Sequence, residues 1–236
     1  MKPVLSTFPG WDLLGRAFHE TGFSVVHSPE WLWGQDICAW HATPDTYQGI
    51  IGGPPCQCFS RLVHMVRQNG LEPKFGNLIP QFERVVEEAR PLWFLMEEVP
   101  DAPEPRVGGY GVHSFLLNNR DLGDAVNRLR RISFGLLGER RVLPLNIVPL
   151  SSPRFEYAAL GGGSRRKHGR KHGMRTLGFR THADFRSICR KQGLPDNFDL
   201  PGFTIRAKCQ AVGNGVPMRM GRALAAAIIE VVGASL

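Results

Sequence analysis

Two short blocks contain the residues of this sequence that are best suited to chemistry. The first reads Gly-Gly-Pro-Pro-Cys-Gln-Cys-Phe-Ser over residues 52–60 and follows the apolar run Gly49–Ile51. The second reads Met-Glu-Glu-Val-Pro over residues 96–100 and ends an apolar run that begins at Leu92. Cys56 is a candidate nucleophile, because a thiolate attacks electrophilic carbon. One of the two carboxyls in the second block could donate a proton to a bound base.

The cysteines allow other readings, which their spacing disfavours. Cys56 could be an incidental thiol in a tight turn, or it could form half of a metal site with Cys58. No second Cys/His pair has matching spacing, so we expect no metal centre. The five cysteines form an odd, scattered set, which is unlike a disulfide framework. We therefore expect free thiols in a reducing interior.

An α/β domain is needed to bring the two blocks together. Apolar runs alternate with helical patterns in the first half of the chain, which is typical of a mostly parallel sheet. Open α/β sheets bind ligands at the carboxyl ends of their strands, and both blocks stand at such ends. The patterns predict strands at residues 4–5, 23–27, 49–51, 92–96, 132–137 and 142–148, and helices at residues 13–18, 82–89, 114–117 and 218–232. Residues 61–77 are predicted to form a loop.

Size and charge limit the class of protein. The chain has 236 residues, of which 42% are hydrophobic, and this is enough for one core with at most a small appendage. The net charge of +8 suggests a polyanionic partner without proving one. Six Lys/Arg gather in the glycine-rich segment 161–175, which would meet phosphates or form a solvated basic loop. We find neither a signal peptide nor an apolar stretch of the roughly 20 residues that a membrane helix needs.

The two blocks resemble the signature motifs of the cytosine-C5 DNA methyltransferase family, and further motifs follow in that family's order along nearly the whole chain. These are Phe8-Pro-Gly-Trp-Asp-Leu-Leu-Gly-Arg-Ala-Phe18, the acid Glu30 after the second strand, Gly34-Gln-Asp-Ile37, Arg128-Leu-Arg130, Gln192-Gly-Leu-Pro-Asp196 and Gln210-Ala-Val-Gly-Asn-Gly-Val-Pro217. The resemblance implies a Rossmann-like methyltransferase sheet with helices on both faces, plus a small target-recognition region. It implies a catalytic domain at residues 1–150, a reduced recognition region at 151–204 and a C-terminal return at 205–236.

The resemblance also implies covalent catalysis on a flipped-out cytosine. The Cys56 thiolate would add to C6 of the base, and Glu97 would protonate or hydrogen-bond N3. Arg128 and Arg130 would hold the base carbonyl and its phosphate. The loop 61–77 would close over the base.

The cofactor implied is S-adenosylmethionine (AdoMet), which leaves as S-adenosylhomocysteine (AdoHcy). Glu30 would bind the ribose hydroxyls and Asp36 the adenine amine. The full pocket would comprise Phe8, Pro9, Gly10, Trp11, Leu13, Glu30, Trp31, Asp36, Ile37, Pro54, Asn214 and Val216. The expected partner is double-stranded DNA, contacted by Gln57, Ser60, Arg165, Arg166, Lys167, Arg170, Lys171 and Arg175. We expect a monomer in the cytoplasm of a bacterial host, with a phage as one potential source of the gene, and no membrane attachment.

Three features depart from the family pattern. Glu98 stands where the family has a positioning Asn, and Val126 stands where it has Gln before the Arg-x-Arg pair. Arg131, or the pair Arg140-Arg141, could compete for an arginine role. The stretch between Pro149 and Thr181 is much shorter than the family's usual recognition domain. Two alternatives therefore stay open: a catalytically impaired regulator that binds AdoMet or DNA, and an RNA cytosine-C5 methyltransferase.

Overall fold

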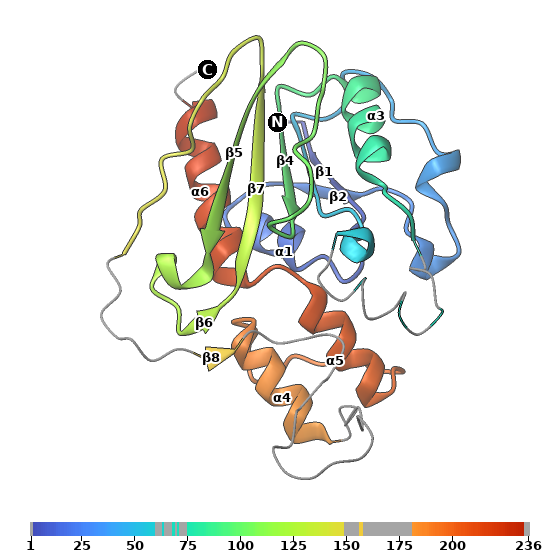
Figure 1. Ribbon diagram of the computed structural model, residues 1–236, viewed down its shortest axis with the longest axis vertical. Helices are drawn as coiled ribbons and strands as arrows, with labels where there is room; N and C mark the ends of the chain where they lie inside the picture. The colour runs from blue at the N-terminus through green and yellow to red at the C-terminus, as the bar shows by residue number, and fades with distance from the viewer. Residues whose placement is uncertain are drawn as a thin grey trace.

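A mixed β-sheet forms the centre of the molecule. The computed structural model describes residues 2–59, 75–148 and 181–233, together with residues 63, 68, 70, 156 and 157. Within these residues, six strands pair in the order β2-β1-β3-β4-β7-β5 (Figure 1). Their bounds are Val4–Thr7 (β1), Val25–His27 (β2), Gly49–Gly52 (β3), Trp93–Glu98 (β4), Tyr110–Asn118 (β5) and Leu129–Leu137 (β7). The strands β1 to β4 run parallel, and β7 runs antiparallel to β4 and β5.

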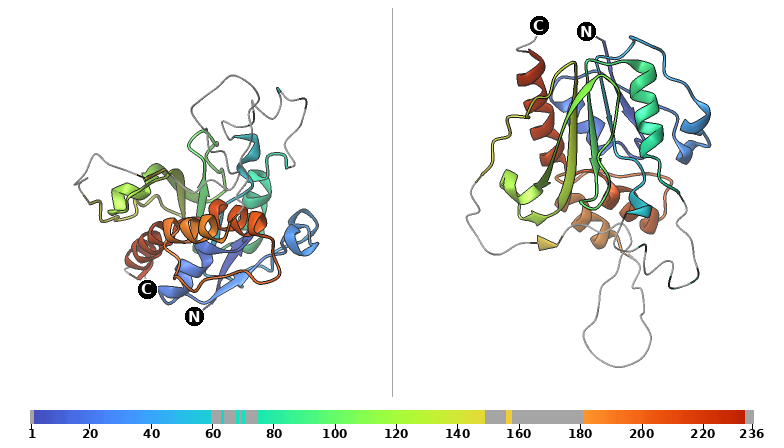
Figure 2. Two further views of the ribbon diagram at one scale, coloured as in Figure 1. Left: turned by 90° about the horizontal axis from the view of Figure 1, so that it is seen from below. Right: turned by 45° about the horizontal axis from the view of Figure 1, so that its top comes forward.

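Helices cover both faces of this sheet (Figures 1 and 2). The helices α1 (Leu13–Glu20) and α6 (Met218–Gly233) pack on one face, and α3 (Ile79–Ala89) packs on the other. The side chains of β4 alternate between the two cores: Trp93 and Leu95 face α6, while Phe94 and Met96 face α3. Every residue of β4 is buried, so the prediction of a strand covered on both sides is confirmed.

A third helical layer lies where the parallel strands end. The helices α4 (His182–Lys191) and α5 (Ile205–Asn214) lie below the sheet in Figure 1. They share a core with the first turn of α1, formed around Phe185, Val212 and Leu13. A short parallel pair, β6 (Val126–Asn127) with β8 (Glu156–Tyr157), lies beside this layer. None of the helices described is long and apolar enough to cross a membrane.

Two predicted elements were wrong. The expected helix at residues 114–117 is part of β5, where Ser114 pairs with Ser133 of β7 and their hydroxyls lie 2.8 Å apart. Pairing along the whole nine-residue strand outweighs the local signal of a serine cap. The expected strand at 142–148 is not a strand: Val142 and Ile147 are exposed, and the segment runs past the edge of β5 without a ladder.

Candidate active site

The turn after β1 adopts a strained backbone conformation and lines a cavity. Phe8, Gly10 and Asp12 have φ angles of 52°, 53° and 48°, in the left-handed region. This region costs a residue other than glycine about 1 kcal/mol or more, so Phe8 and Asp12 need compensating contacts.

The carboxylate of Asp12 supplies much of that compensation. It caps α1 by accepting from the Gly15 backbone N–H at 2.9 Å, and it accepts from the Ser6 hydroxyl at 2.7 Å. Its other oxygen lies 2.7 Å from Nε2 of His27 at the end of β2. A Cβ on Gly15 would lie 1.9 Å from this carboxylate, so glycine is required there. Asp12 thus ties the turn to β1, β2 and α1.

Glu30 connects the same turn to the segment after β2. One carboxylate oxygen accepts from the Gly10 N–H at 3.0 Å. The other accepts from the Leu32 N–H at 3.2 Å and caps the 3-10 helix η1 (Trp31–Trp33). Each oxygen keeps a second acceptor site, so the carboxylate can also accept hydrogen bonds from a ligand.

Asp36 stands on a loop that α3 holds in place. Asp36 caps the 3-10 helix η2 (Ile37–Ala39) by accepting from the Cys38 N–H at 2.9 Å. From α3, Arg84 donates to the Ile37 carbonyl at 2.8 Å, and Glu88 accepts from the Ala42 N–H at 2.9 Å.

The Glu88 carboxylate accepts three hydrogen bonds where α3 meets the loop that follows Asp36. It also takes a hydrogen bond from His41 at 2.8 Å and one from Arg84 at 2.7 Å. Burial raises the pKa of Glu88, but the hydrogen bonds from Ala42, His41 and Arg84 outweigh it and lower the pKa to about 2. The carboxylate is therefore charged over the whole physiological range.

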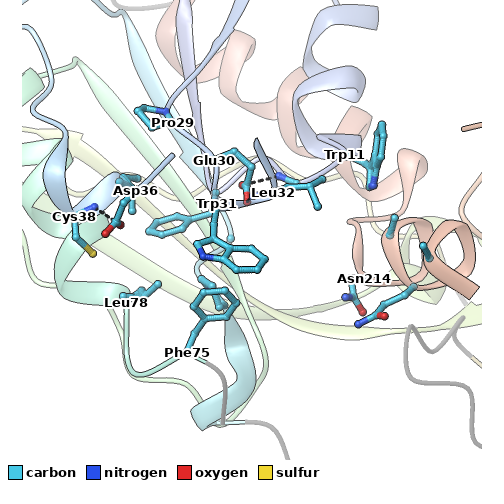
Figure 3. Close-up of a pocket in the computed structure, with 18 of the residues that line it drawn as sticks. Trp11, Pro29, Glu30, Trp31, Leu32, Asp36, Cys38, Phe75, Leu78 and Asn214 are labelled. Carbon is cyan, nitrogen blue, oxygen red and sulfur yellow. Dashed lines mark hydrogen bonds between the residues drawn. The ribbon is translucent and has the colours of Figure 1, made fainter. Parts of the chain in front are cut away.

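A cavity of about 650 Å³ lies between these loops and α5. Asp36 and Cys38 stand at one end of it, and Trp11 and Asn214 stand at the other (Figure 3). Of the residues predicted to hold the cofactor, it is lined by Phe8, Gly10, Trp11, Glu30, Trp31, Asp36, Ile37 and Asn214. The prediction missed other lining residues, among them Pro29, Leu32, Cys38, Gly53, Pro55, Phe75, Leu78, Phe203, Ala207, Gln210 and Ala211.

A smaller cavity of about 170 Å³ adjoins the first and reaches the end of β4. Phe8, Gly10, Gly53 and Asn214 line both cavities, and Glu97 lines the smaller one. Pro9, Leu13 and Val216, also predicted as cofactor contacts, line it too. Pro54 is buried and lines neither cavity; its neighbour Pro55 lines the larger one.

The C-terminal wall of the cavities is held by Arg128. This guanidinium is 5% exposed and donates to the carbonyls of Gly213, Asn214 and Gly215 at 3.0 to 3.1 Å. Gln192 donates to the Gly215 carbonyl as well, at 2.8 Å. The three hydrogen bonds that Arg128 donates place it in the pocket wall. They compete with the predicted contact of its guanidinium with a base. Its carbonyl partners are distant in sequence, and no local signal could have indicated them.

Arg130 lies beside Glu97 instead. Its Nε is 2.7 Å from a carboxylate oxygen of Glu97, and both side chains are largely buried. A Cβ on Gly53 would come within 3.1 Å of the other Glu97 oxygen, so the glycine leaves that oxygen room for a ligand. A carboxyl and a guanidinium side by side can bind a ring nitrogen and a neighbouring carbonyl together.

Cys56 is the first residue of the 3-10 helix η3 (Cys56–Cys58), which begins where β3 leaves the sheet. The next two residues are attached to Phe75. Gln57 accepts from the Phe75 N–H at 3.3 Å, and the Cys58 thiol donates to the Phe75 carbonyl at 3.2 Å. The Phe75 ring meets Trp31 edge to face, with centroids 5.7 Å apart. The wall of the large cavity is thus joined to the helix that begins at Cys56.

Glu98, the next residue, is more deeply buried than Glu97. It is 1% exposed, and one of its oxygens accepts from the Val99 N–H at 2.9 Å. Burial, with a smaller contribution from the Glu97 charge, raises the pKa of Glu98 to about 8, against lowering effects of the Val99 hydrogen bond and of Arg130. The carboxyl is therefore mostly protonated at neutral pH.

Of the predicted DNA contacts, Gln57 is exposed. The others lie outside the described residues: Ser60, Arg165, Arg166, Lys167, Arg170, Lys171 and Arg175. Most of the predicted catalytic loop 61–77 lies outside them as well.

Comparisons with known proteins agree with this geometry. Residues 36–162 match the family model of C-5 cytosine-specific DNA methylases. The chain is 33% identical to the type II methyltransferase M.BanI of Aneurinibacillus aneurinilyticus over 122 residues, which are 45% of this chain and 28% of that protein. It is 26% identical to M.FnuDI of Fusobacterium nucleatum over 188 residues, 65% of this chain and 53% of that protein. The chain thus spans about a quarter to a half of the length of these curated relatives.

Solved structures share the fold over nearly the whole chain. A candidate DNA modification methyltransferase encoded within a prophage (E. coli) superposes with a TM-score of 0.65 at 17% identity, covering 99% of this chain and all of that one. The S. pombe Dnmt2 methyltransferase superposes with a TM-score of 0.64 at 12% identity, covering 98% and 99%. The predicted Rossmann-like methyltransferase fold with helices on both faces of the sheet is confirmed.

Proposed function

Since the chain belongs to the family of C-5 cytosine-specific DNA methylases, we propose that it transfers a methyl group from AdoMet to C5 of cytosine in DNA. The observation that carries the proposal is the continuity of the two cavities. The larger one has carboxylates suited to a nucleoside, and the smaller one ends at Glu97, at the edge of the sheet where β3 leads into η3.

The large cavity fits AdoMet in size and in chemistry. Glu30 can accept hydrogen bonds from the two ribose hydroxyls, and Asp36 can accept one from the adenine amine. Phe8 and Trp31 offer apolar surface to the adenosine, and Asn214 borders the smaller cavity that leads to Glu97. When bound, AdoMet supplies an electrophilic methyl group on a sulfonium.

The protein's own residues prepare the base. The Cys56 thiolate adds to C6 of a flipped-out cytosine, and Glu97 hydrogen-bonds or protonates N3, so that electron density moves to C5. Arg130 orients the Glu97 carboxyl through their 2.7 Å contact and stabilises charge on the base carbonyl. After methyl transfer to C5, the C5 proton leaves and the C6–sulfur bond breaks, which restores the aromatic ring and the free thiol.

The substrate proposed is double-stranded DNA, bound by a monomer in the bacterial cytoplasm. Arg165, Arg166, Lys167, Arg170, Lys171 and Arg175 are proposed to contact phosphates, with Gln57 and Ser60 close to the flipped base. Phosphate contacts orient the protein but do not read a sequence. Of the proposed recognition region 151–204, the part that forms α4 shares a core with α1 and α5, which favours placing recognition before residue 181.

Incubation with tritiated AdoMet tests this function. We expect label in genomic DNA from a strain that lacks 5-methylcytosine, and 5-methylcytosine in the digested product by mass spectrometry. Label in RNA alone would identify an RNA methyltransferase. Binding of AdoHcy without any transfer would identify the impaired regulator.

A further inference from the structure

Glu98 is the last residue of β4, the strand that pairs with β3. In the parallel pair of β3 and β4, Gly52 lies opposite Met96. β3 ends at this pair, two residues before Pro54, and β4 continues for two residues to Glu98. Since Met96 faces the α3 side of the sheet, the alternation of a strand places Glu98 on that side and Glu97 on the other. Glu98 is thus the last residue of β4 and directly follows Glu97, the proposed catalytic acid.

The carboxyl of Glu98 is removed from water and poorly provided with donors. One oxygen accepts the Val99 N–H, and the other is buried with no hydrogen-bond partner among the residues that the structure describes. A buried carboxylate is stable when it is paired with a cation or accepts several hydrogen bonds. A single backbone donor does not meet that requirement. An uncharged carboxyl needs far fewer hydrogen bonds, because it carries no charge to be compensated.

The charged groups around Glu98 do not supply the missing cation. Glu97, on its own strand, carries a like charge, and Arg130 of β7 is paired with Glu97. Arg131, opposite Glu98 in the ladder, donates to the Pro100 carbonyl at 2.8 and 3.2 Å and lies 3.4 Å from Glu104.

The remaining elements on this side add no compensating charge. The inward face of α3 is apolar, with Phe82, Val85 and Val86 in the core that includes Met96. The end of β3 contributes Gly52, followed by Gly53 and Pro54.

We propose that Glu98 acts as an uncharged carboxylic acid that positions the carboxyl end of β4, and that its ionisation is a built-in alkaline switch for the reaction. The switch itself rests on this chain's geometry; its effect on methyl transfer rests on the proposed function. The pKa of about 8 agrees with the burial and the missing donors. Ionisation would add a second carboxylate charge that interacts electrostatically with both members of the Glu97–Arg130 pair. Glu97 would then lose the contact that orients it, while the cofactor contacts of Glu30 and Asp36 would stay in place.

The direct test is an infrared titration of the protein between pH 5 and 10, with and without Glu98→Gln. We expect the wild type to show a protonated carboxyl band that disappears with a midpoint near pH 8. Glu98→Gln should lack that band, and Glu104→Gln, a change at a glutamate that is 58% exposed, should retain it. A wild type without the band at pH 6.5 overturns the proposal. Because this readout needs no methyl transfer, it fails or succeeds independently of the proposed function.

Turnover and stability give two further, distinct signatures. Above pH 8 the wild-type kcat, relative to its own value at pH 7, should fall about tenfold per pH unit, as for loss of a single required proton. The same ratio for Glu98→Gln should stay level. The KM for AdoMet should change less than twofold in both proteins. A general loosening of the fold would raise this KM as well. Equal pH profiles for the two proteins contradict the switch.

The stability signature lies at lower pH. Glu98 has a folded-state pKa of about 8 against an ordinary value of 4.5. Its stabilising contribution is therefore complete below about pH 4.5, declines between the two values and is absent above pH 8. The melting temperature of the wild type relative to Glu98→Gln should follow that course. If Glu98→Gln does not fold, the infrared titration of the wild type alone decides the question.

Discussion

Cys56 and Cys58 carry the same thiol two residues apart, but the proposed mechanism needs only the first. We expect Cys56→Ser to lower methyl transfer by on the order of a thousandfold or more, because the hydroxyl is a far weaker nucleophile than the thiolate. AdoHcy affinity should stay within about twofold, since the change removes no predicted cofactor contact. Single-turnover kinetics and equilibrium dialysis measure the two quantities.

Cys58→Ser is the matched control for that substitution. The Cys58 thiol donates to the Phe75 carbonyl at 3.2 Å, and a serine hydroxyl can make the same hydrogen bond. We expect it to retain most of the turnover. Near-normal activity of Cys56→Ser would instead show that the covalent step is wrongly assigned.

The carboxylate of Glu30 has two tasks, because it holds Gly10 and Leu32 and is proposed to bind the ribose. Glu30→Gln should weaken AdoHcy binding about tenfold, on the order of 1 kcal/mol, since the amide supplies one acceptor oxygen where the carboxylate supplies two. Titration calorimetry measures the loss. The exposed Glu87→Gln should have no effect. Unchanged affinity in Glu30→Gln would place the ribose elsewhere.

Contacts between elements decide where the predicted adenine end of the pocket lies. Arg84 and Glu88 of α3 hold the backbone of the Asp36 loop without lining the cavity. We expect Glu88→Gln to raise the KM for AdoMet about three- to tenfold and to leave kcat within twofold. Glu87→Gln, one residue away on the exposed side of α3, is the matched control. Equal effects on kcat and KM would indicate a general defect of the fold.

The low pKa of Glu88 also fixes its pH dependence. Its folded-state pKa of about 2 lies below the ordinary value of 4.5, so its stabilising effect is complete above about pH 4.5 and is lost as the pH falls toward 2. The melting temperature of the wild type relative to Glu88→Gln should therefore be level from pH 5 to 9 and decrease only in acid. A difference that grows between pH 6 and 9 would contradict this assignment.

The sequence predicts the parallel part of the sheet well, and physical reasons limit the rest. The strands β1, β3 and β4 are short and continuously buried, each has an apolar core, and each is followed within two residues by glycine or proline, so they are recognisable locally. The strand β5 is mostly half-buried and lies at the edge of the sheet, so its pattern is weak, and a capping signal at Ser114 suggested a helix instead. Only its pairing with β7 makes it a strand.

The same distinction applies to the site. Cys56, Glu97 and Glu30 were predicted as site residues because each stands at or shortly after the end of a strand in a recognisable block. The place of Arg128 in the pocket wall depends on carbonyls at residues 213–215, which no local pattern connects to it. The aromatic contact of Trp31 with Phe75 could not be predicted from the sequence either, because it depends on the path that the chain takes after β3.

For the molecule as a whole, the net charge of +8 predicts binding to DNA that depends on salt. Neutralising four of the Lys/Arg in the segment 164–175 should weaken binding to all duplexes alike. It should also reduce the slope of log affinity against log salt by up to about 0.9 for each phosphate that is no longer neutralised. Affinities for a cognate and a scrambled duplex at several salt concentrations measure both effects. A variant that loses cognate binding alone, with its slope unchanged, would show that this segment reads bases.

The proposed cofactor cavity takes its walls from both ends of the described chain, since Phe8 and Asn214 both line it. During synthesis, the ribosome makes the wall at Phe8 well before the wall at Asn214. A nascent chain released before Asn214 has strands and a nucleophile loop but no closed site for AdoMet. We therefore expect a chain that terminates before Asn214 to lose AdoHcy binding, which equilibrium dialysis of such a truncated protein would measure.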